Sequence, residues 1–431
     1  MRCSLRETQT AERIMSDRDN ATERSVDEKI SNKNYAADVN LSMQYTRWFL
    51  TLLGIWPYVI SDASRIEKLV SKFLMPFPSV VITLLLIPLV SIPIFRDLTP
   101  SQFLLLLAPL SFRASSVLKN LILISRRDAI KFCIQHMKTD WQRIETDEDR
   151  EIMMKNLRVG RNLTLICVLC LYSGTIFYNT LPFVSPRKVN ALNQTIRPIT
   201  VPGIDIYVDL RAGHNYEIVV FISCLSIFYV SAIISAICNL AAVLVCHACG
   251  QIQIVMSRLE RLVGQENGKY IDQNSLQRGI SFIIRIHVRV LRFASKIDQV
   301  LRELCLIEVV AATLIICLVA YMFITERKNT SIMASVSYTT LLISLSFNIF
   351  IFCRIGELLK EKCEAVGKAA YMTEWYTLPG KTGLTLVMLI TMAHYPRRLT
   401  AGRIIELSIS TFGNIMRTSF GYLNMLRTMT E

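Results

Sequence analysis

The chain has 431 residues, of which 52% are hydrophobic and only 19% are charged. A soluble globular domain of this composition would lack the polar side chains needed to cover its surface, so the sequence indicates a membrane protein. The formal net charge of +14 does not predict nucleic-acid binding, because the basic residues lie between long apolar runs, as they do in the cytosolic loops of membrane proteins.

The N-terminal segment, residues 1–72, is polar at its start. Charged side chains are scattered through residues 1–40, which contain no apolar core of a signal peptide. We therefore expect residues 1–72 to form a cytosolic segment in which residues 2–28 are disordered.

Six apolar runs follow between residues 73 and 353. A helix needs about 20 mostly apolar residues to cross the hydrocarbon core of a bilayer, and each run is long enough. We expect transmembrane helices at residues 73–95, 102–124, 162–181, 217–246, 304–324 and 332–353.

The last part of the chain divides into two segments. Residues 354–402 contain an apolar stretch, 383–393, that is too short to cross a bilayer, so we expect a cytosolic anchor region here. Residues 403–431 contain a longer run, 404–426, which carries Glu406 and Arg417. This run predicts a seventh transmembrane helix followed by a short outer tail.

The distribution of Lys and Arg predicts the orientation. If the amino terminus is cytosolic, the inner segments carry 35 of these residues and the outer segments carry 8. Because basic residues are retained on the cytosolic side, we expect a cytosolic amino terminus and an extracellular carboxyl terminus. In that topology the sequons at Asn193 and Asn329 face outward, where glycosylation is possible.

The inner connections are too long to be simple turns. Residues 128–158, 251–263, 279–300 and 354–371 repeat apolar side chains at helical spacing. Such stripes must be buried, so we expect the transmembrane helices to extend into a compact cytosolic bundle. The alternative is that these segments are separate amphipathic helices lying on the inner leaflet.

Four ionisable residues lie inside the predicted spans: Arg113, Lys119, Glu308 and Arg417. A charge at the bilayer centre costs roughly 2.5 to 3.5 kcal/mol, so these side chains should face the protein interior or lie near a membrane edge. Glu308 is a candidate for the buried partner of a basic residue, whose identity the sequence leaves open.

The predicted seventh helix has one polar face. Steps of about 100° per residue from Leu407 place on that face Thr400, Arg403, Thr411, Asn414, Thr418, Gly421 and Met425. Such a stripe must face water or protein, so it either lines a pore or joins helices through small and polar side chains. Leu407 and Met425 are apolar, and each is a candidate for a dewetting gate. The stripe has no ring of Asp or Glu, so strong cation selectivity is not expected.

The sequence predicts no enzyme, no metal site and no cofactor. The five histidines follow no catalytic or metal-ligand spacing, and Cys246 and Cys249 form a single CxxC without a second pair of ligands. The twelve cysteines imply no disulfide framework.

Several short motifs resemble the insect odorant receptor family. Those near the carboxyl terminus are Trp375-Tyr376-Thr377-Leu378-Pro379, Leu399-Thr400-Ala401-Gly402, Leu407-Ser408 and Thr418-Ser419-Phe420. Those near the amino terminus, which resemble hymenopteran members, are Trp48-Phe49-Leu50 and Gly54-Ile55-Trp56-Pro57.

This resemblance implies an all-α fold of seven transmembrane helices and a role as a tuning subunit of a ligand-gated, nonselective cation channel. Such a subunit assembles with an obligate co-receptor into a heterotetramer, in the plasma membrane of sensory-neuron dendrites. The chain lacks the long insertion of the co-receptor in the second cytosolic loop. The resemblance also favours the pore for the polar face of the seventh helix, which implies as pore-lining residues Leu407, Thr411, Asn414, Thr418, Gly421 and Met425.

The resemblance further implies a ligand pocket in the outer half of the second, third, fourth and sixth helices. The predicted topology places at these ends Phe103, Phe112, Tyr172, Ile176, Tyr178, Phe221, Leu225, Met333, Ser337 and Tyr338. Aromatic and apolar side chains with a few hydroxyls suit a small volatile hydrophobic ligand. Taken singly, each residue could equally serve ordinary helix packing.

Three other classes of protein were compared with these features. A G-protein-coupled receptor also has seven spans, but its amino terminus is extracellular, and the sequence shows neither a DRY-type triplet nor an NPxxY motif. A gustatory-type receptor channel has the same topology, and the Trp375-Tyr376 stretch disfavours it. A secondary transporter usually shows two related halves, which this sequence does not.

Overall fold

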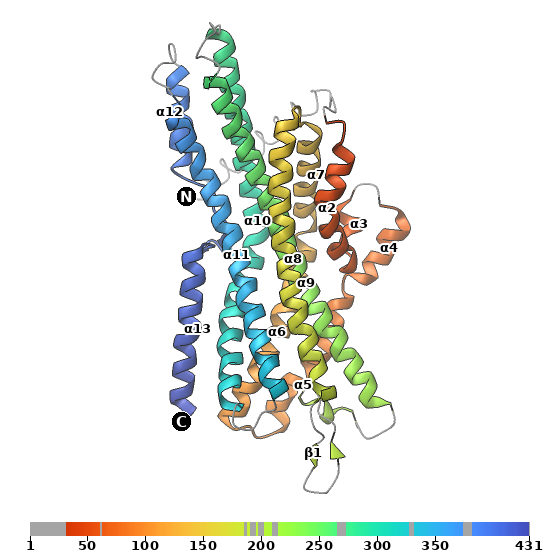
Figure 1. The fold of residues 1–431 in the computed structure, drawn as a ribbon. Coiled ribbons are helices and arrows are strands. Elements are labelled where there is room, and N and C mark those ends of the chain that lie inside the picture. Colours follow the sequence, from red (N-terminus) through yellow and green to blue (C-terminus); the bar gives the residue numbers. More distant parts are fainter. Residues whose placement is uncertain are drawn as a thin grey trace, which may run out of the picture.

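The computed structural model describes residues 32–60, 63–184, 188–189, 195–196, 202–208, 214–264, 273–326, 332–373 and 382–430. Three sets of predictions lie outside the described residues: the N-terminal tail, the sequons at Asn193 and Asn329, and the motif of residues 375–379. The described residues form an elongated bundle of long helices with two small hairpins (Figure 1).

Six helices in the described part of the chain are long and apolar enough to cross a bilayer, and each contains or overlaps one of the six predicted runs. They are α5 (Phe77–Phe95), α6 (Pro100–Ser125), α8 (Asp147–Val184), α9 (Asn215–Gly264), α10 (Gln273–Glu326) and α11 (Ile332–Met372). The chain is thus a multi-pass membrane protein.

The first predicted run began too early. Residue 73 belongs to a separate helix, α4 (Arg65–Leu74), and α5 begins only at Phe77. Pro76 and Pro78 flank this start, and proline is favoured at the first turn of a helix because it has no N–H to leave without a partner.

Several helices are much longer than a bilayer is thick. α9 has 50 residues and α10 has 54. At about 1.5 Å per residue each is roughly 75 to 80 Å long, more than twice the hydrocarbon core. Their extensions form a second bundle with α2 (Tyr35–Leu52), α3 (Trp56–Val59) and α7 (Arg127–Gln142), seen in the upper half of Figure 1.

The stripes predicted to form a compact bundle are buried. On α7 the buried apolar residues are Ile130, Cys133, Ile134, Met137 and Trp141, and Ile144 follows them in the next connection. The α9 stripe is buried at Ile252, Val255 and Leu259. The prediction of a compact bundle is therefore confirmed over separate amphipathic helices.

α9 is the central helix of the molecule. Residues 229–250 are all buried, and the helix packs against α2, α5, α6, α8, α10 and α11. A buried chain of hydrogen bonds crosses it, because Thr46 donates to Asn239 Oδ1 at 2.7 Å and Asn239 Nδ2 donates to Thr164 Oγ1 at 3.2 Å. These bonds fix α9 between α2 and α8.

The two ends of the molecule differ. At one end lie α7 and the short α12 (Thr382–Ala393), which packs against α11. At the other lie the hairpin of β1 (Lys188–Val189) and β2 (Thr195–Ile196), and the end of α13 (Ile409–Thr430) (Figure 1). The 3₁₀ turn η1 (Ile204–Ile206) packs against α5. The segments predicted to be cytosolic thus gather at the α7 end, and those predicted to be extracellular gather at the β1 end.

Candidate ligand and pore sites

The last helix, α13, is held in place by a hairpin that precedes it. β3 (Thr400–Ala401) pairs with β4 (Ile405–Glu406), and Gly402 and Arg403 turn the chain with positive φ values of 64° and 63°. The backbone N–H and the hydroxyl of Thr400 both donate to Asp298 Oδ1 at 2.8 Å, and the N–H of Gly402 donates to the Arg302 carbonyl at 2.9 Å. The hairpin is thereby tied to α10.

α13 begins at Ile409, five residues after the predicted start at 404. The Ser408 hydroxyl accepts the N–H of Thr411 at 3.1 Å, as an N-cap does, and the Thr411 hydroxyl donates to the Glu406 carbonyl at 2.6 Å. The placement of Thr400 and Arg403 on the polar helical face was therefore wrong, because strand and turn residues do not follow helical periodicity.

The placement of Leu407 on the same face was also wrong. Leu407 precedes the helix and is buried, and its N–H donates to the Leu399 carbonyl at 2.9 Å. Its carbonyl lies so close to α11 that a Cβ on Gly356 would sit 2.3 Å away from it. Leu407 is therefore packed against α11 and does not lie on the exposed face of α13.

One face of α13 packs against the rest of the chain. Ile415, Ser419 and Leu423 are buried at successive turns. The Ser419 hydroxyl donates to the Thr313 carbonyl of α10 at 3.2 Å, and the Phe412 ring meets the Phe350 ring of α11 edge-on, 5.5 Å between centroids.

The opposite face of α13 is exposed. It includes four of the predicted pore-lining residues: Asn414, Thr418, Gly421 and Met425. Thr411 is partly buried at the start of this face, and Arg417 is exposed beside it. A Cβ at Gly421 would meet nothing within 4 Å. Among the described residues, therefore, no helix covers this polar stripe.

Three of the ligand candidates lie on the outside of the bundle. Phe103, Ile176 and Phe221 are exposed on α6, α8 and α9. The structure therefore does not bring them together with the others. The side chains of Tyr178 and Met333 lie outside the described part of the structure.

The remaining five candidates are at least partly buried. Phe112, Leu225 and Tyr338 pack against the main hydrophobic core from α6, α9 and α11. The Tyr172 ring lies edge-on to Phe228, 5.9 Å between centroids, and the buried Ser337 hydroxyl donates to the Phe177 carbonyl at 3.5 Å.

Sequence analysis missed the buried hydroxyls of the same helices. Thr175 of α8 and Ser231 of α9 share a hydrogen bond of 2.5 Å, and the Ser344 hydroxyl donates to the Cys170 carbonyl at 2.6 Å. The Ser226 hydroxyl is fully buried, with no hydrogen-bond partner among the described residues. The signal in the sequence was the repeated serines of the otherwise apolar span of α9, which could have pointed to buried hydroxyls.

An ion pair is buried where four helices meet. Lys119 Nζ of α6 lies 2.7 Å from Glu308 Oε2 of α10, and both side chains are almost inaccessible. Asn348 of α11 donates to the other oxygen of Glu308 at 2.5 Å, and Cys167 of α8 donates to Asn348 Oδ1 at 3.6 Å. The predicted basic partner of Glu308 is thus confirmed and is Lys119. Arg113 is also buried, whereas Arg417 is exposed.

A second buried carboxylate stabilises the bundle at the α7 end. Asp140 lies 3.1 Å from His136 Nδ1 and 3.0 Å from His247 Nε2, and it accepts a 2.7 Å bond from Arg289. Burial alone would raise the pKa of Asp140, but the hydrogen bonds from the two histidines and the charge of Arg289 hold that pKa well below its usual range. The cluster ties α7 to α9 and α10.

The whole fold resembles that of solved insect olfactory receptors. The structure of the olfactory receptor OR5 from Machilis hrabei in complex with eugenol superposes with a TM-score of 0.74 at 12% identity, covering 92% of this chain and 100% of that one. A second structure of the same receptor gives a TM-score of 0.69 at 13% identity, covering 91% of this chain and 99% of that one. The architecture is therefore that of a seven-helix insect olfactory receptor.

Sequence comparison gives the family. The sequence model of the 7tm odorant receptor family matches residues 99–420, which is most of the chain, so the protein belongs to that family. It is 24% identical to odorant receptor 85b of Drosophila melanogaster over 90% of this chain and 98% of that one. It is 20% identical to odorant receptor 10 of Aedes albopictus, where the match spans 53% of this chain and only 58% of the relative.

Proposed function

We propose that this chain is an odorant receptor subunit that binds a small volatile hydrophobic ligand and, with a co-receptor, gates a nonselective cation channel. The exposed polar face of α13 carries this proposal. The site of action is the plasma membrane of a sensory-neuron dendrite, with the α7 end in the cytosol, as the excess of Lys and Arg in those segments favours.

The pore role follows from the cost of exposing polar groups to lipid. Asn414, Thr418 and the charged Arg417 lie on a face that no described part of the chain covers. A membrane helix keeps such groups in water or against protein. Four subunits around an axis, each presenting this face inward, would place these groups around a water-filled path, with Met425 as the remaining candidate gate.

The ligand role rests on the inward-facing candidates. Phe112, Tyr172, Leu225 and Tyr338 come from the four helices of the predicted pocket, and each is at least partly buried. They supply an apolar lining, and the free hydroxyl of Ser226 supplies a hydrogen bond for a ligand that carries an oxygen. The receptor OR5, solved with eugenol, shares this fold.

The test is current recording from cells that express the full chain with and without a co-receptor. Currents evoked by odorants should appear only with both subunits. Substituted cysteines locate the pore, because Thr418→Cys should become sensitive to a charged thiol reagent applied from outside, whereas the neighbouring Ser419→Cys, which is buried, should not. Odorant-evoked currents that are blocked through Ser419→Cys and not through Thr418→Cys would exclude the proposed pore face.

A second pair of variants locates the ligand. Tyr172→Ala removes a partly buried ring and should shift the odorant concentration for half-maximal current at least tenfold. Ile176→Ala, one turn along the same helix but exposed, should shift it less than twofold. Equal shifts would place the pocket elsewhere.

A further inference from the structure

The short helix α4 carries an apolar face that the described chain leaves uncovered. Its side chains Ile66, Leu69, Val70 and Phe73 are 75%, 59%, 57% and 72% exposed. These positions are three, four and seven residues apart, so they form one continuous stripe. Of the ten residues of α4, only Ser71 is buried. This is the opposite of α7, whose apolar stripe is buried.

α4 is nevertheless a well-defined helix. Ser64 and Glu67 form a capping box, in which the Glu67 N–H donates to Ser64 Oγ at 3.1 Å and the Ser64 N–H donates to Glu67 Oε2 at 2.9 Å. The Tyr58 hydroxyl of α3 donates to the Lys68 carbonyl at 3.2 Å. The helix is therefore held in place with its apolar stripe turned away from the protein.

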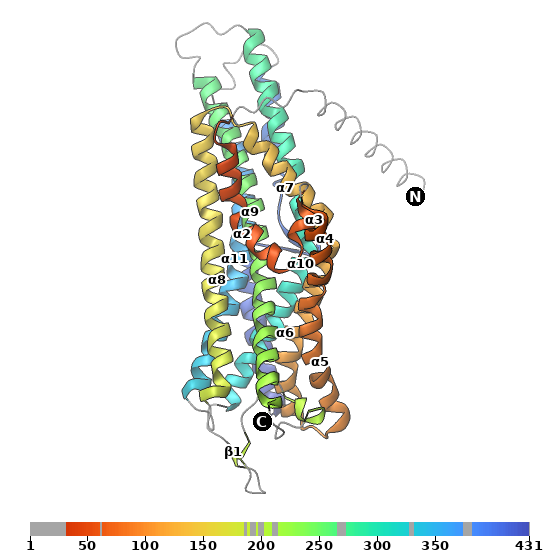
Figure 2. The same ribbon diagram turned by 90° about the vertical axis from the view of Figure 1, so that its right-hand side faces the viewer.

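The position of α4 matches the surface of a bilayer. Only two residues separate the helix from α5, the first membrane span, and it projects from the side of the molecule at the level where the two bundles meet (Figure 1). Figure 2 shows α3 and α4 near the viewer, on the side of the molecule away from α13. α4 thus lies far from the face proposed to meet other subunits, where lipid would surround the protein.

Basic side chains lie beside the apolar stripe. Arg65, Lys68 and Lys72 share the adjacent side of the helix, because they too are three, four and seven residues apart. No described carboxylate lies within 4.0 Å of their charged groups. An amphipathic helix with basic residues flanking a large apolar face binds the boundary between headgroups and acyl chains, most strongly in anionic membranes.

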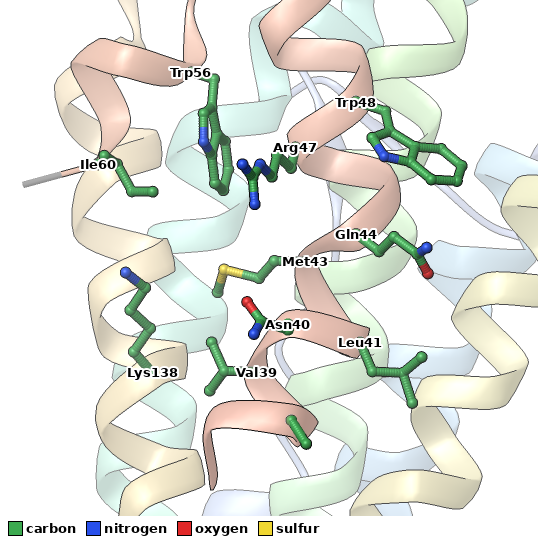
Figure 3. A pocket seen from close by; sticks show the side chains of 11 residues that line it. Val39, Asn40, Leu41, Met43, Gln44, Arg47, Trp48, Trp56, Ile60 and Lys138 are labelled. Carbon is green, nitrogen blue, oxygen red and sulfur yellow. The ribbon is translucent and has the colours of Figure 1, made fainter. Parts of the chain in front are cut away.

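A groove next to α3 adds further positive charge to this side. It has a volume of about 550 Å³ and runs between α2, α3 and α7. Figure 3 shows Arg47 beside Trp56 at one end of the groove and Lys138 across from Met43. Trp48, also in its lining, is exposed. Tryptophan is favoured at membrane interfaces, so this surface suits a headgroup layer.

We propose that α4 lies in the leaflet at the α7 end of the molecule and that Arg65, Lys68 and Lys72 bind the headgroups of anionic phospholipids. The apolar stripe enters the acyl-chain boundary, and the three cations reach the phosphates and carboxylates above it. A second protein is the less favoured occupant, because the stripe directly adjoins a membrane span and has three cations beside it.

Lipid binding to the purified full chain in detergent tests the headgroup part. The probes are dioctanoyl phosphatidylserine and dioctanoyl phosphatidylcholine. The unaltered protein should bind the serine lipid at least fivefold more tightly, and R65Q/K68Q/K72Q should reduce this preference to less than twofold. The matched variant R143Q/K155Q/R158Q removes three exposed cations from α7's end and α8, and it should keep the preference.

The variant R65K/K68R/K72R preserves charge and should retain the preference, which separates loss of charge from loss of folding. The proposal is overturned if the unaltered protein shows no preference, or if both neutralising variants lose it equally.

Tryptophan quenching in liposomes tests the depth of α4. Phe73→Trp should add emission that lipids with brominated acyl chains quench, relative to the unaltered protein. Phe282→Trp, a similarly conservative change at an exposed position on the extension of α10, should add emission that those lipids leave unquenched. Equal quenching of the two added signals, or none for Phe73→Trp, would place α4 outside the membrane.

Discussion

α9 and α13 are both predicted to span the membrane, yet they are packed in opposite ways. Residues 229–250 of α9 are all buried, whereas among residues 409–428 of α13 only Ile415, Ser419 and Leu423 are buried, along one edge. A helix that is surrounded within its own chain stabilises the subunit. A helix with one polar face left open contributes little to the subunit and is available to a pore. The contrast separates the buried residues that hold α9 in the fold from the exposed residues of α13 that we propose line a pore.

The largest expected difference between the two regions concerns charge. Lys119→Met leaves the Glu308 carboxylate buried without its cation, and removing one partner of a buried ion pair costs about 3 to 5 kcal/mol. Arg417→Met removes a cation from the exposed face of α13 and should change the free energy of unfolding by less than about 0.5 kcal/mol. The measurement is thermal unfolding of the purified full chain in detergent. Similar losses of stability for Lys119→Met and Arg417→Met would contradict the contrast between α9 and α13. Adding Glu308→Gln to Lys119→Met removes the unpaired carboxylate and should recover part of the lost stability.

Two asparagines provide the next comparison. Asn239→Ala leaves Thr46 and Thr164 without their shared partner in the core and should cost about 1 to 3 kcal/mol. Asn414→Ala on α13 should change stability by less than about 0.5 kcal/mol. The same unfolding assay measures both, and single-channel conductance should change only for Asn414→Ala. A stability loss at Asn414 as large as that at Asn239 would show that α13 is buried.

A buried and an exposed histidine provide the third comparison, which concerns how stability depends on pH. Burial lowers the pKa of His287 to about 4, below the unfolded value of about 6.5. Its neutral form therefore supports the fold fully above pH 6.5, and this contribution is lost as the pH falls from 6.5 toward 4. Between pH 7 and pH 5 the unaltered protein should lose up to about 2 kcal/mol more stability than His287→Leu. Replacing the exposed His214 by leucine is the control for the loss of a histidine side chain.

The smallest effects concern two glycines. A Cβ at Gly421 meets nothing within 4 Å, so Gly421→Ala should raise stability by about 0.5 to 1 kcal/mol through helix propensity. At Gly356 the new Cβ would lie 2.3 Å from the Leu407 carbonyl, so Gly356→Ala should instead destabilise the protein. Shifts of the unfolding midpoint in opposite directions for the two variants would sharpen the distinction between the exposed face of α13 and the buried face of α11. A lower midpoint for Gly421→Ala would contradict it.

The sequence predicted the long helices well, but only part of the polar face assigned to the last helix lies on α13, because Thr400, Arg403 and Leu407 precede it. The spans follow from apolar length, and the stripes of α7 and α9 follow from helical spacing, both of which are local properties. The start of α13 was missed, because the turn at Gly402 and Arg403 depends on bonds to Asp298 and Arg302 of α10. Helical periodicity alone predicted that the helix extended back over residues 404–408, where the structure has part of a hairpin.

The candidate ligand residues were predicted less well. Sequence and topology select an end of each helix but not a face, and Phe103, Ile176 and Phe221 turned out to be exposed. An aromatic side chain in a membrane span suits lipid as well as it suits a pocket. Composition therefore cannot distinguish an inward from an outward ring.

What the sequence by itself determined is the class of protein, the approximate position of its six long apolar spans and the segments in which its basic charge gathers. These depend on the cost of placing polar groups in hydrocarbon, which acts on each segment separately. Only the tertiary structure decided which face each helix buries and which charges pair. Lys119 and Glu308 are 189 positions apart in the chain, and only packing of α6 against α10 brings them within 2.7 Å. The same packing leaves α4 and one side of α13 uncovered, because a helix face is buried only where a neighbouring helix happens to lie.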